Sequence, residues 1–200
     1  MDAMISVPVS KRVVGLTGLK GCGKSTAAAA LVRDFGFVEV CFADALKDAC
    51  VAMFGWTREE LDDPKGKEQT CEIWGVTRRK ALQRVGTDLV RNTMPSAFPE
   101  LNLEGSFWVE VMRHKIDRLI HAGVSRIVVS DVRFDDEAAL VRDLGGIVVR
   151  IMRPGSVAST DLHASETEMA YIEVDGTAIN RLNQSETMVA DVCTIAKLVK

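Results

Sequence analysis

The stretch of sequence that decides the fold is GLKGCGKS, residues 18–25. It matches the pattern GxxxxGK(S/T), in which glycines let backbone N–H groups come close to phosphate oxygens. A short apolar run, Arg12–Thr17, precedes it, and Lys24–Phe35 follow with a helical periodicity that Gly36 ends. Such a loop directs its amides and the positive end of the helix dipole at one point. The sequence therefore predicts a polyphosphate site, with an ordinary glycine-rich turn as the alternative.

Individual residues of this P-loop, residues 18–25, fit a nucleoside triphosphate. Lys24 would bridge the β and γ phosphates, and the Ser25 hydroxyl would complete the shell of a Mg²⁺ ion that keeps several of its waters. Thr26 could reach the α phosphate. The chain has no Asn-Lys-x-Asp tetrad, by which GTPases read guanine, so guanine specificity for the triphosphate is not supported.

Strands and helices alternate along most of the chain, which predicts an α/β fold. Further helices are expected over Ala43–Phe54, Asp135–Leu144 and Ser185–Leu198. The expected strands are Arg12–Thr17, Phe37–Cys41, Arg126–Ser130, Ile147–Met152 and Thr177–Ile179. Five strands interleaved with helices imply a parallel sheet covered by helices on both faces.

Two interruptions of this alternation define smaller parts of a single domain, residues 1–200. Residues 56–123 are predicted to form an inserted helical subdomain, with helices over about Thr77–Asn92 and Ser106–Ala122. Thr77 and Ser106 are expected to be N-caps. Residues 153–165, with a proline, a glycine and small polar residues, are expected to form a lid.

Composition narrows the class of protein. The 200 residues are 47% hydrophobic, which excludes a disordered or collagen-like chain, and 25 basic against 28 acidic residues give a net charge of −3. An acidic chain has no overall positive field for a nucleic acid polymer. Five cysteines without a CxxC pair, no signal peptide and no apolar run of 18 residues predict a cytoplasmic protein without membrane spans.

Candidate residues for a second, acceptor substrate follow the third predicted strand. Asp131 comes directly after it, at the edge of the sheet where parallel sheets bind ligands, and there a carboxylate can hold Mg²⁺ through water. Arg133 follows two residues later and would bind an anion beside it. A helix N-cap for Asp131 and an ion pair for Arg133 are the alternatives.

The predicted helix over Thr77–Asn92 carries further arginines. With α-helical spacing, Leu82, Val85 and Leu89 form an apolar face, and a second face presents Arg84, Asp88 and Arg91. Guanidinium groups bind phosphate oxygens in pairs, and the glycine between these residues, Gly86, is expected to mark a close approach of another group. A solvated face with an Arg84–Asp88 pair is the alternative.

Three more charged residues lie near the same edge of the sheet. Asp44 and Lys47 open the helix after the second strand, and Arg153 follows the fourth strand, where it could neutralise a transferring phosphoryl group. For Asp44 a helix cap, and for Lys47 and Arg153 an exposed surface position, are the alternatives. The sequence HASE, residues 163–166, lacks the partners of a hydrolase or a metal site.

Taken together, six blocks of sequence resemble the phage-type deoxynucleoside monophosphate kinases. The blocks are the P-loop, FADALK (42–47), LQRVGTD (82–88) with Arg91, SDVRF (130–134) with Glu137, HASE (163–166) and Ile179-Asn180. The resemblance runs from about Val13 to Leu198. It implies a P-loop kinase with strand order 2-3-1-4-5, an acceptor-binding insert and a lid, and it is compatible with a homodimer.

The resemblance also implies roles for individual residues. ATP would be bound by Lys20, Gly21, Cys22, Gly23, Lys24, Ser25, Thr26 and Asn180. The deoxynucleotide would be bound by Asp44, Lys47, Arg84, Thr87, Asp88, Arg91, Trp108, Asp131, Arg133, Phe134, Glu137, His163 and Glu166. Arg153 would be a lid arginine. For Trp108, a place in the core is the alternative.

The expected reaction is transfer of the γ-phosphoryl group of ATP to a deoxynucleoside monophosphate, with Mg²⁺ as cofactor. Lys24, Asp131, Arg133 and Arg153 are the expected catalytic residues. One alternative is a kinase that phosphorylates dephospho-coenzyme A or phosphomevalonate, since such kinases share the P-loop. The other is a nucleotide-dependent binding switch. The shape of the pocket, rather than a sequence motif, decides which base is accepted.

Overall fold

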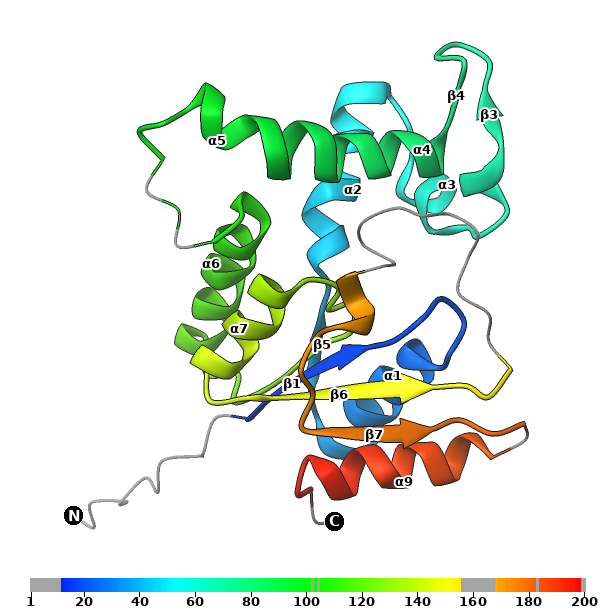
Figure 1. Ribbon diagram of the computed structural model, residues 1–200, viewed down its shortest axis with the longest axis vertical. Helices are drawn as coiled ribbons and strands as arrows, with labels where there is room; N and C mark the ends of the chain where they lie inside the picture. Colours follow the sequence, from blue (N-terminus) through cyan, green and yellow to red (C-terminus); the bar gives the residue numbers. More distant parts are fainter. Residues whose placement is uncertain (1–11, 102, 104, 156–167, 183, 199–200) are drawn as a thin grey trace, which may run out of the picture. The chain divides into compact units, whose positions relative to one another are not determined.

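The computed structural model describes residues 12–101, 103, 105–155, 168–182 and 184–198 (Figure 1). The chain divides into two compact units, one of Met1–Val40 with Ile116–Lys200 and one of Cys41–Lys115. We call them the sheet unit and the helical unit. The inserted subdomain predicted over residues 56–123 overlaps the helical unit, which begins earlier because helix α2 packs against the helices that follow it.

The sheet unit is built on a five-stranded parallel sheet, as predicted. The strands lie in the order β2-β5-β1-β6-β7, which is 2-3-1-4-5 when only the strands of this sheet are counted. All four pairings are parallel, and β1 lies in the centre between β5 and β6. The strands span Arg12–Thr17 (β1), Val38–Val40 (β2), Arg126–Val129 (β5), Ile147–Met152 (β6) and Gly176–Ile179 (β7).

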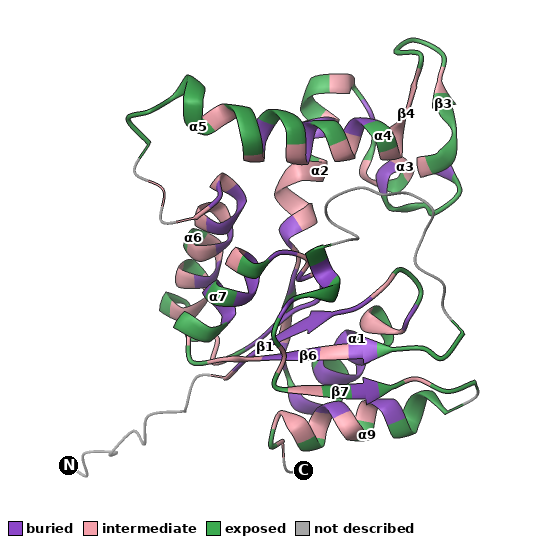
Figure 2. Ribbon diagram, in the orientation of Figure 1, coloured by how far each residue is buried: buried purple, intermediate pink, exposed green. Residues whose placement is uncertain are grey.

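Helices cover both faces of this sheet, which explains why its central strands are largely buried (Figure 2). Helix α1 (Lys24–Phe35) and helix α9 (Ser185–Ile195) pack on one face around Leu16, Leu31 and Met188. Helix α7 (Asp135–Asp143) packs against β1 and β6. A short 3-10 helix, η3 (Glu168–Ala170), precedes β7. Strands β1 and β6 and helix α1 have the bounds that the sequence predicted.

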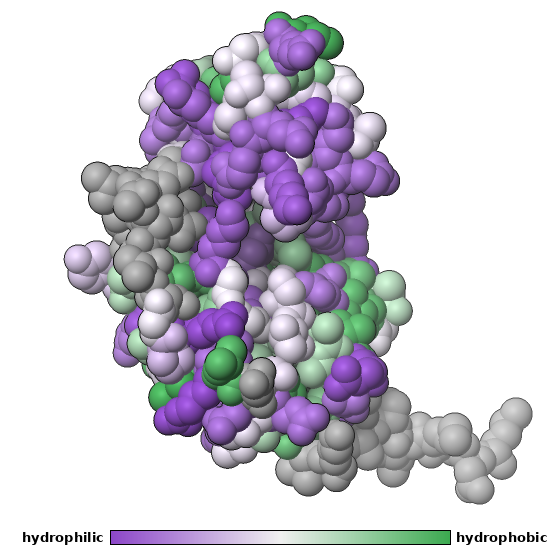
Figure 3. Space-filling model, turned by 90° about the vertical axis from the view of Figure 1, so that its right-hand side faces the viewer, coloured by the Kyte–Doolittle hydropathy of each residue, from purple (hydrophilic) through white to green (hydrophobic). Residues whose placement is uncertain are grey.

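The helical unit consists of short elements around α2 (Phe42–Phe54). They are α3 (Arg58–Asp62), the 3-10 helix η1 (Gly66–Glu68), the hairpin of β3 (Thr70–Cys71) and β4 (Val76–Thr77), α4 (Arg78–Gln83), the π-helix η2 (Arg84–Thr93), α5 (Met94–Ala97) and the first part of α6 (Phe107–His121). Hydrophilic residues dominate most of the upper part of the view in Figure 3, with hydrophobic residues at its top, and the turn of the hairpin carries the exposed Ile73 and Trp74. Thr77 caps α4, as predicted, by accepting a hydrogen bond from the Lys80 N–H at 3.2 Å.

The helix predicted over Thr77–Asn92 is partly a π-helix, and this overturns its predicted faces. In a π-helix the carbonyl of residue i bonds to the N–H of residue i+5, so residues four and five apart share a face. Val85 and Val90 are therefore buried, whereas Leu89, assigned to the apolar face, is 49% exposed. The α-helical spacing that placed Arg84 and Arg91 on one face does not apply here.

Two further sequence predictions concern membranes and the lid. No helix among the described residues is long and apolar enough to cross a membrane. Of the predicted lid, residues 153–165, the structure describes only residues 153–155, where Arg153 is exposed beyond the end of β6.

Candidate functional site

The P-loop leaves the central strand β1 and turns into α1. Gly23, the residue before the helix, has φ 117°, a left-handed conformation that disfavours any side chain. A Cβ at Gly23 would also lie 2.5 Å from Asn180 Nδ2, so a side chain here would require Asn180 or the loop to move. No side chain of the described residues caps α1, and its first turn contains no acidic residue. The first N–H groups of the helix and the positive end of its dipole are thus arranged for an anion.

Lys24 already lies over this loop. Its Nζ donates hydrogen bonds to the carbonyl oxygens of Gly18 and Leu19, the latter at 2.9 Å, and lies 3.9 Å from Cys22 Sγ. Carbonyl oxygens carry only partial negative charge, so a phosphate can replace them as the partner of the ammonium group. Ser25 and Thr26 are exposed at the start of α1, and Lys20 is exposed on the loop.

Asn180 comes from the far end of the sequence but packs on the P-loop. Its Nδ2 donates a hydrogen bond to the Cys22 carbonyl at 2.8 Å, and its backbone N–H donates to the Met152 carbonyl at 2.7 Å. The residue therefore joins the end of β6 to the loop. This position agrees with the predicted group of ATP-binding residues, although the contact with ATP itself stays a prediction.

Asp131 and Arg133 lie beyond the end of β5, in the same unit. The Val132 N–H donates to the Leu16 carbonyl at 3.1 Å, so this segment runs beside the end of β1. Glu137 is buried, with 4% of its surface exposed, and its Oε2 accepts hydrogen bonds from the backbone N–H groups of Arg133, at 2.8 Å, and Phe134, at 3.3 Å. Glu137 thus fixes the turn that carries Arg133, and the Phe134 side chain is buried.

In the helical unit, Asp44 is at the centre of an ion-pair cluster. Its Oδ1 lies 3.1 Å from Arg58 Nη2 and its Oδ2 lies 3.0 Å from Lys115 Nζ. Burial raises the pKa of Asp44, but the hydrogen bonds and charges of Lys115 and Arg58 outweigh it and hold the pKa below its ordinary value. Lys47 pairs with Asp62, with 2.6 Å between Nζ and Oδ1, and Asp62 Oδ2 lies 3.7 Å from Arg58 Nε, so this pair adjoins the cluster.

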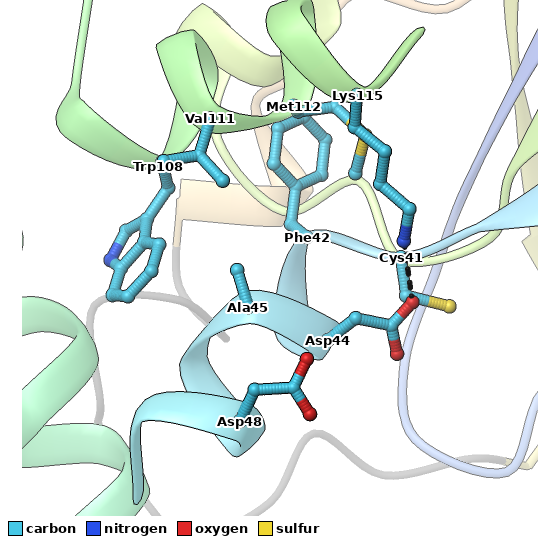
Figure 4. Close-up of a pocket in the computed structure, with 9 residues that line it drawn as sticks. All are labelled: Cys41, Phe42, Asp44, Ala45, Asp48, Trp108, Val111, Met112 and Lys115. Carbon is cyan, nitrogen blue, oxygen red and sulfur yellow. Dashed lines mark hydrogen bonds and ion pairs between the residues drawn. The ribbon is translucent and has the colours of Figure 1, made fainter. Parts of the chain in front are cut away.

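A cavity of about 170 Å³ lies between α2 and α6, entirely within the helical unit (Figure 4). Two predicted acceptor residues, Asp44 and Trp108, lie in its wall. Apolar side chains make most of the wall, and Asp44, Asp48 and Lys115 supply its charged groups. The complete lining consists of Cys41, Phe42, Asp44, Ala45, Asp48, Trp108, Val111, Met112 and Lys115.

Trp108 and Gly86 connect this α2–α6 cavity to the π-helix. The Trp108 indole N–H donates a hydrogen bond to the Gly86 carbonyl at 2.9 Å, which fixes the edge of the ring. A Cβ at Gly86 would lie 2.8 Å from Leu46 Cδ2, so the close approach predicted at this glycine is confirmed. Thr87 is half-buried, and Arg84 and Asp88 are exposed on the same π-helix, while Arg91 is half-buried.

Sequence reasoning missed two charged residues of the cavity wall, Asp48 and Lys115, and also Arg58, which pairs with Asp44 and Asp48. A periodic signal for two of them was present. Asp48 follows Asp44 by one helical turn, and Lys115 follows Trp108 by two, so each lies on the same helical stripe as a predicted residue. Only the fold brings the two stripes together, because Lys115 and Asp44 are 71 residues apart in the chain. His163 and Glu166, predicted at the acceptor, lie outside the described residues.

Comparison with known proteins identifies the family. Residues 67–188 match the family described as deoxynucleotide monophosphate kinase. A protein of Acanthamoeba polyphaga mimivirus, provisionally named a deoxynucleotide monophosphate kinase, is 40% identical over 163 residues, which cover 80% of this chain and 83% of the viral protein. This chain belongs to the deoxynucleotide monophosphate kinase family.

Two more similarities agree with this assignment. The deoxynucleotide monophosphate kinase of enterobacteria phage T4 is 30% identical over 102 residues, which cover 51% of this chain and 37% of the phage protein. A solved structure of an unliganded sugar kinase from a Janibacter species has a TM-score of 0.51 at 15% identity, over 95% of this chain and 96% of its own, and shares the fold alone. The family membership makes the chain an ATP-dependent nucleotide kinase and does not favour dephospho-coenzyme A or phosphomevalonate as acceptor.

Proposed function

We propose that this kinase binds ATP on the P-loop and transfers its γ-phosphoryl group to the 5′-phosphate of a deoxynucleoside monophosphate, giving the diphosphate and ADP. The observation that carries the proposal is the loop itself. An uncapped helix N-terminus among the described residues, loop glycines in the left-handed region and the Lys24 ammonium group converge there on one point. That combination is the usual cradle of a nucleotide polyphosphate.

Each residue of the loop has a distinct task in this proposal. The loop amides bind the phosphates, and Lys24 exchanges its carbonyl partners for oxygens of the β and γ phosphates. Thr26, exposed in the first turn of α1, reaches the α phosphate. Asn180 holds the Cys22 carbonyl and thereby keeps the loop in shape beside the nucleotide.

The available oxygen ligands fit a Mg²⁺ ion carried in with ATP. Mg²⁺ prefers few protein oxygens and keeps several waters, and Ser25 offers a hydroxyl at the exposed start of α1. Asp131 offers a carboxylate beyond β5 in the same unit, as a ligand through water. No cluster of three His, Cys, Asp or Glu side chains that could hold a metal ion occurs in the described part of the chain. When bound, Mg²⁺ neutralises charge on the phosphate oxygens.

We propose acceptor residues in each unit separately. Arg133, positioned by Glu137, and Arg153 from the end of β6 are proposed to neutralise the acceptor phosphate and the transferring phosphoryl group. In the helical unit, Arg84, Thr87, Asp88 and Arg91 of the π-helix are proposed to contact the deoxynucleotide. Asp44 and Trp108 would contribute through the α2–α6 cavity. Lys47, paired with Asp62, would act by keeping α2 and α3 together.

No covalent intermediate or strong general base is needed. The acceptor phosphate is already an anion at pH 7, so its oxygen is a ready nucleophile. Catalysis then consists of aligning two anions and neutralising their repulsion, for which lysine and arginine side chains suffice as the protein's own contribution. The family resemblance is compatible with a homodimer, and light scattering of the purified chain measures the oligomeric state directly.

The test is ADP production from ATP and Mg²⁺ with the four dNMPs, the four NMPs and dephospho-coenzyme A offered separately. We expect turnover that depends on at least one dNMP. Lys24→Ala should reduce it at least a hundredfold while the circular dichroism spectrum is unchanged, whereas Lys65→Ala, an exposed lysine of the helical unit, should leave it intact. Turnover by a folded Lys24→Ala protein at the wild-type rate would refute the mechanism.

A further inference from the structure

The α2–α6 cavity has the size and chemistry of a site for one planar ring. A cavity of about 150 Å³ accommodates benzene, and this one has about 170 Å³. Phe42, Ala45, Trp108, Val111 and Met112 give it apolar walls that suit a flat ring, whereas Asp44, Asp48 and Lys115 lie together on another side (Figure 4). A ring with apolar faces and one polar edge matches this division.

The charged groups of the cavity wall have hydrogen-bond acceptors and donors that no other described residue uses. These unused groups decide which donors and acceptors the polar edge of a bound ring must present. Both oxygens of Asp44 are used, one by Arg58 and one by Lys115. Asp48 accepts from Arg58 Nη1 through Oδ1 at 2.6 Å, and its Oδ2 has no hydrogen bond to the described residues. Lys115 Nζ has three protons and donates one to Asp44. The cavity therefore offers an unused acceptor at Asp48 and unused donors at Lys115.

Guanine complements these groups better than the other bases do. Its pairing edge presents two adjacent N–H donors, at N1 and N2, next to the O6 acceptor. A carboxylate can only accept and an ammonium group can only donate. Asp48 therefore suits the two donors, since Oδ2 is unused and Oδ1 keeps a second lone pair beside its bond to Arg58, and Lys115 suits O6. Adenine and cytosine would turn a ring nitrogen lone pair toward the carboxylate beside their amino group. Thymine has one N–H between two carbonyl oxygens.

We propose that Asp48 and Lys115 read the base of the acceptor nucleotide and make dGMP the preferred substrate, with Arg58 as the residue that positions Asp48. The inference rests on the proposed function, because it takes the α2–α6 cavity to be the base site of a nucleotide kinase. Arg58 spans Asp44 and Asp48 with its two terminal nitrogens, so it fixes two carboxylates one helical turn apart on α2. The capping box of Thr57 and Glu60 fixes the start of α3, which carries Arg58.

The experiment compares kcat/KM for dGMP, dAMP, dCMP and dTMP in the wild type and in Asp48→Asn. A paired hydrogen bond to a base edge corresponds to a preference of roughly tenfold or more, so wild type should favour dGMP by that factor. Asp48→Asn should lose about the same factor for dGMP alone. Because an amide presents a donor beside an acceptor, the ratio of dAMP to dGMP turnover should rise. The KM for ATP should not change.

Controls separate base reading from folding and from the proposed function. Glu59→Gln removes an exposed carboxylate from α3 and should leave the base profile unchanged. Calorimetric binding of dGMP and dTMP to the wild type and Asp48→Asn gives the same comparison without turnover. Turnover of dNMPs with no preference for dGMP, or an equal loss for all four in Asp48→Asn, would overturn this inference and leave the kinase intact. If no dNMP binds or is turned over, the proposed function fails and this inference fails with it.

Discussion

The P-loop and the α2–α6 cavity are built in opposite ways. The P-loop is one run of eight residues, and its shape depends on backbone angles at glycines and on the end of a helix. The cavity takes its side chains from two helices, and Arg58 of a third helix holds two of them in place. A phosphate has the same shape in every substrate and suits a fixed backbone cradle. A base must be distinguished from other bases, which requires side chains that differ among proteins.

The largest expected effect concerns two glycines of the sheet unit, Gly23 and Gly36, whose backbone lies in the left-handed region. Replacing each by alanine tests the comparison. Gly23→Ala places a Cβ 2.5 Å from Asn180 Nδ2 at φ 117°, so the loop or the Asn180 side chain bonded to it must shift. We expect activity to fall at least about a hundredfold, because a misplacement near 1 Å is enough for such a loss. Gly36, with φ 67°, ends the same helix, and its Cβ would meet nothing within 4 Å.

Gly36→Ala is therefore the matched control. This substitution should lower the free energy of unfolding by about 1–2 kcal/mol, because alanine is strained in the left-handed region. The specific activity of the folded enzyme should not change. Steady-state assays and thermal unfolding of the two variants measure both quantities. Equal losses of activity in the two would mean that backbone strain, rather than the shape of the phosphate cradle, limits catalysis.

Gly86→Ala makes the corresponding change beside the cavity, with an intermediate effect. The new Cβ would lie 2.8 Å from Leu46 Cδ2, on the residue whose carbonyl holds Trp108. Because Leu46 ends in flexible methyl groups, we expect an overpacking cost of about 1–3 kcal/mol and a several-fold rise in the KM for the dNMP, with the KM for ATP unchanged. Gly105→Ala, whose Cβ would lie 3.4 Å from Val109 Cγ1, is the control. An equal rise in both KM values would show that the two sites are not separable.

The same contrast explains which parts of the structure could be predicted from the sequence and which could not. The P-loop, the bounds of β1 and α1 and the Thr77 cap depend on neighbouring residues, so local patterns were enough to predict them. The π-helix defeated prediction because residues 84–93 carry a pattern that also suits an α-helix, and the choice depends on packing against α2 and Trp108. The only local signal at Arg58 is its spacing of four from Asp62, because its hydrogen-bond partners Asp48 and Asp44 are ten and fourteen residues earlier on another helix.

A smaller effect is expected where the end of the chain supports the P-loop. Asn180→Ala removes the hydrogen bond to the Cys22 carbonyl, and such a bond contributes about 1 kcal/mol. That corresponds to an approximately fivefold rise in the KM for ATP, with the KM for the dNMP unaffected. Asn180→Asp replaces the donor by an acceptor facing a carbonyl oxygen and should be worse than alanine. A KM for ATP that is the same in all three proteins would remove Asn180 from the ATP site.

The smallest predicted effect concerns the acid stability of the ion-pair cluster in the helical unit. Although burial raises the pKa of Asp44, its partners Lys115 and Arg58 lower it below the ordinary value, so the folded state holds the proton less tightly than the unfolded state. The stabilisation is therefore fully present above about pH 4, the pKa of an unfolded aspartate, and is lost as the pH falls through the folded pKa. The pairs are partly exposed and contribute at most about 1 kcal/mol, or 2–4 °C in melting temperature. Asp44→Asn should accordingly melt slightly below the wild type at pH 6, and the difference should shrink toward pH 3 in melts followed by circular dichroism. A difference that stays constant over this range would mean that Asp44 contributes through packing and not through its charge, and the cavity would then owe its shape to its apolar wall.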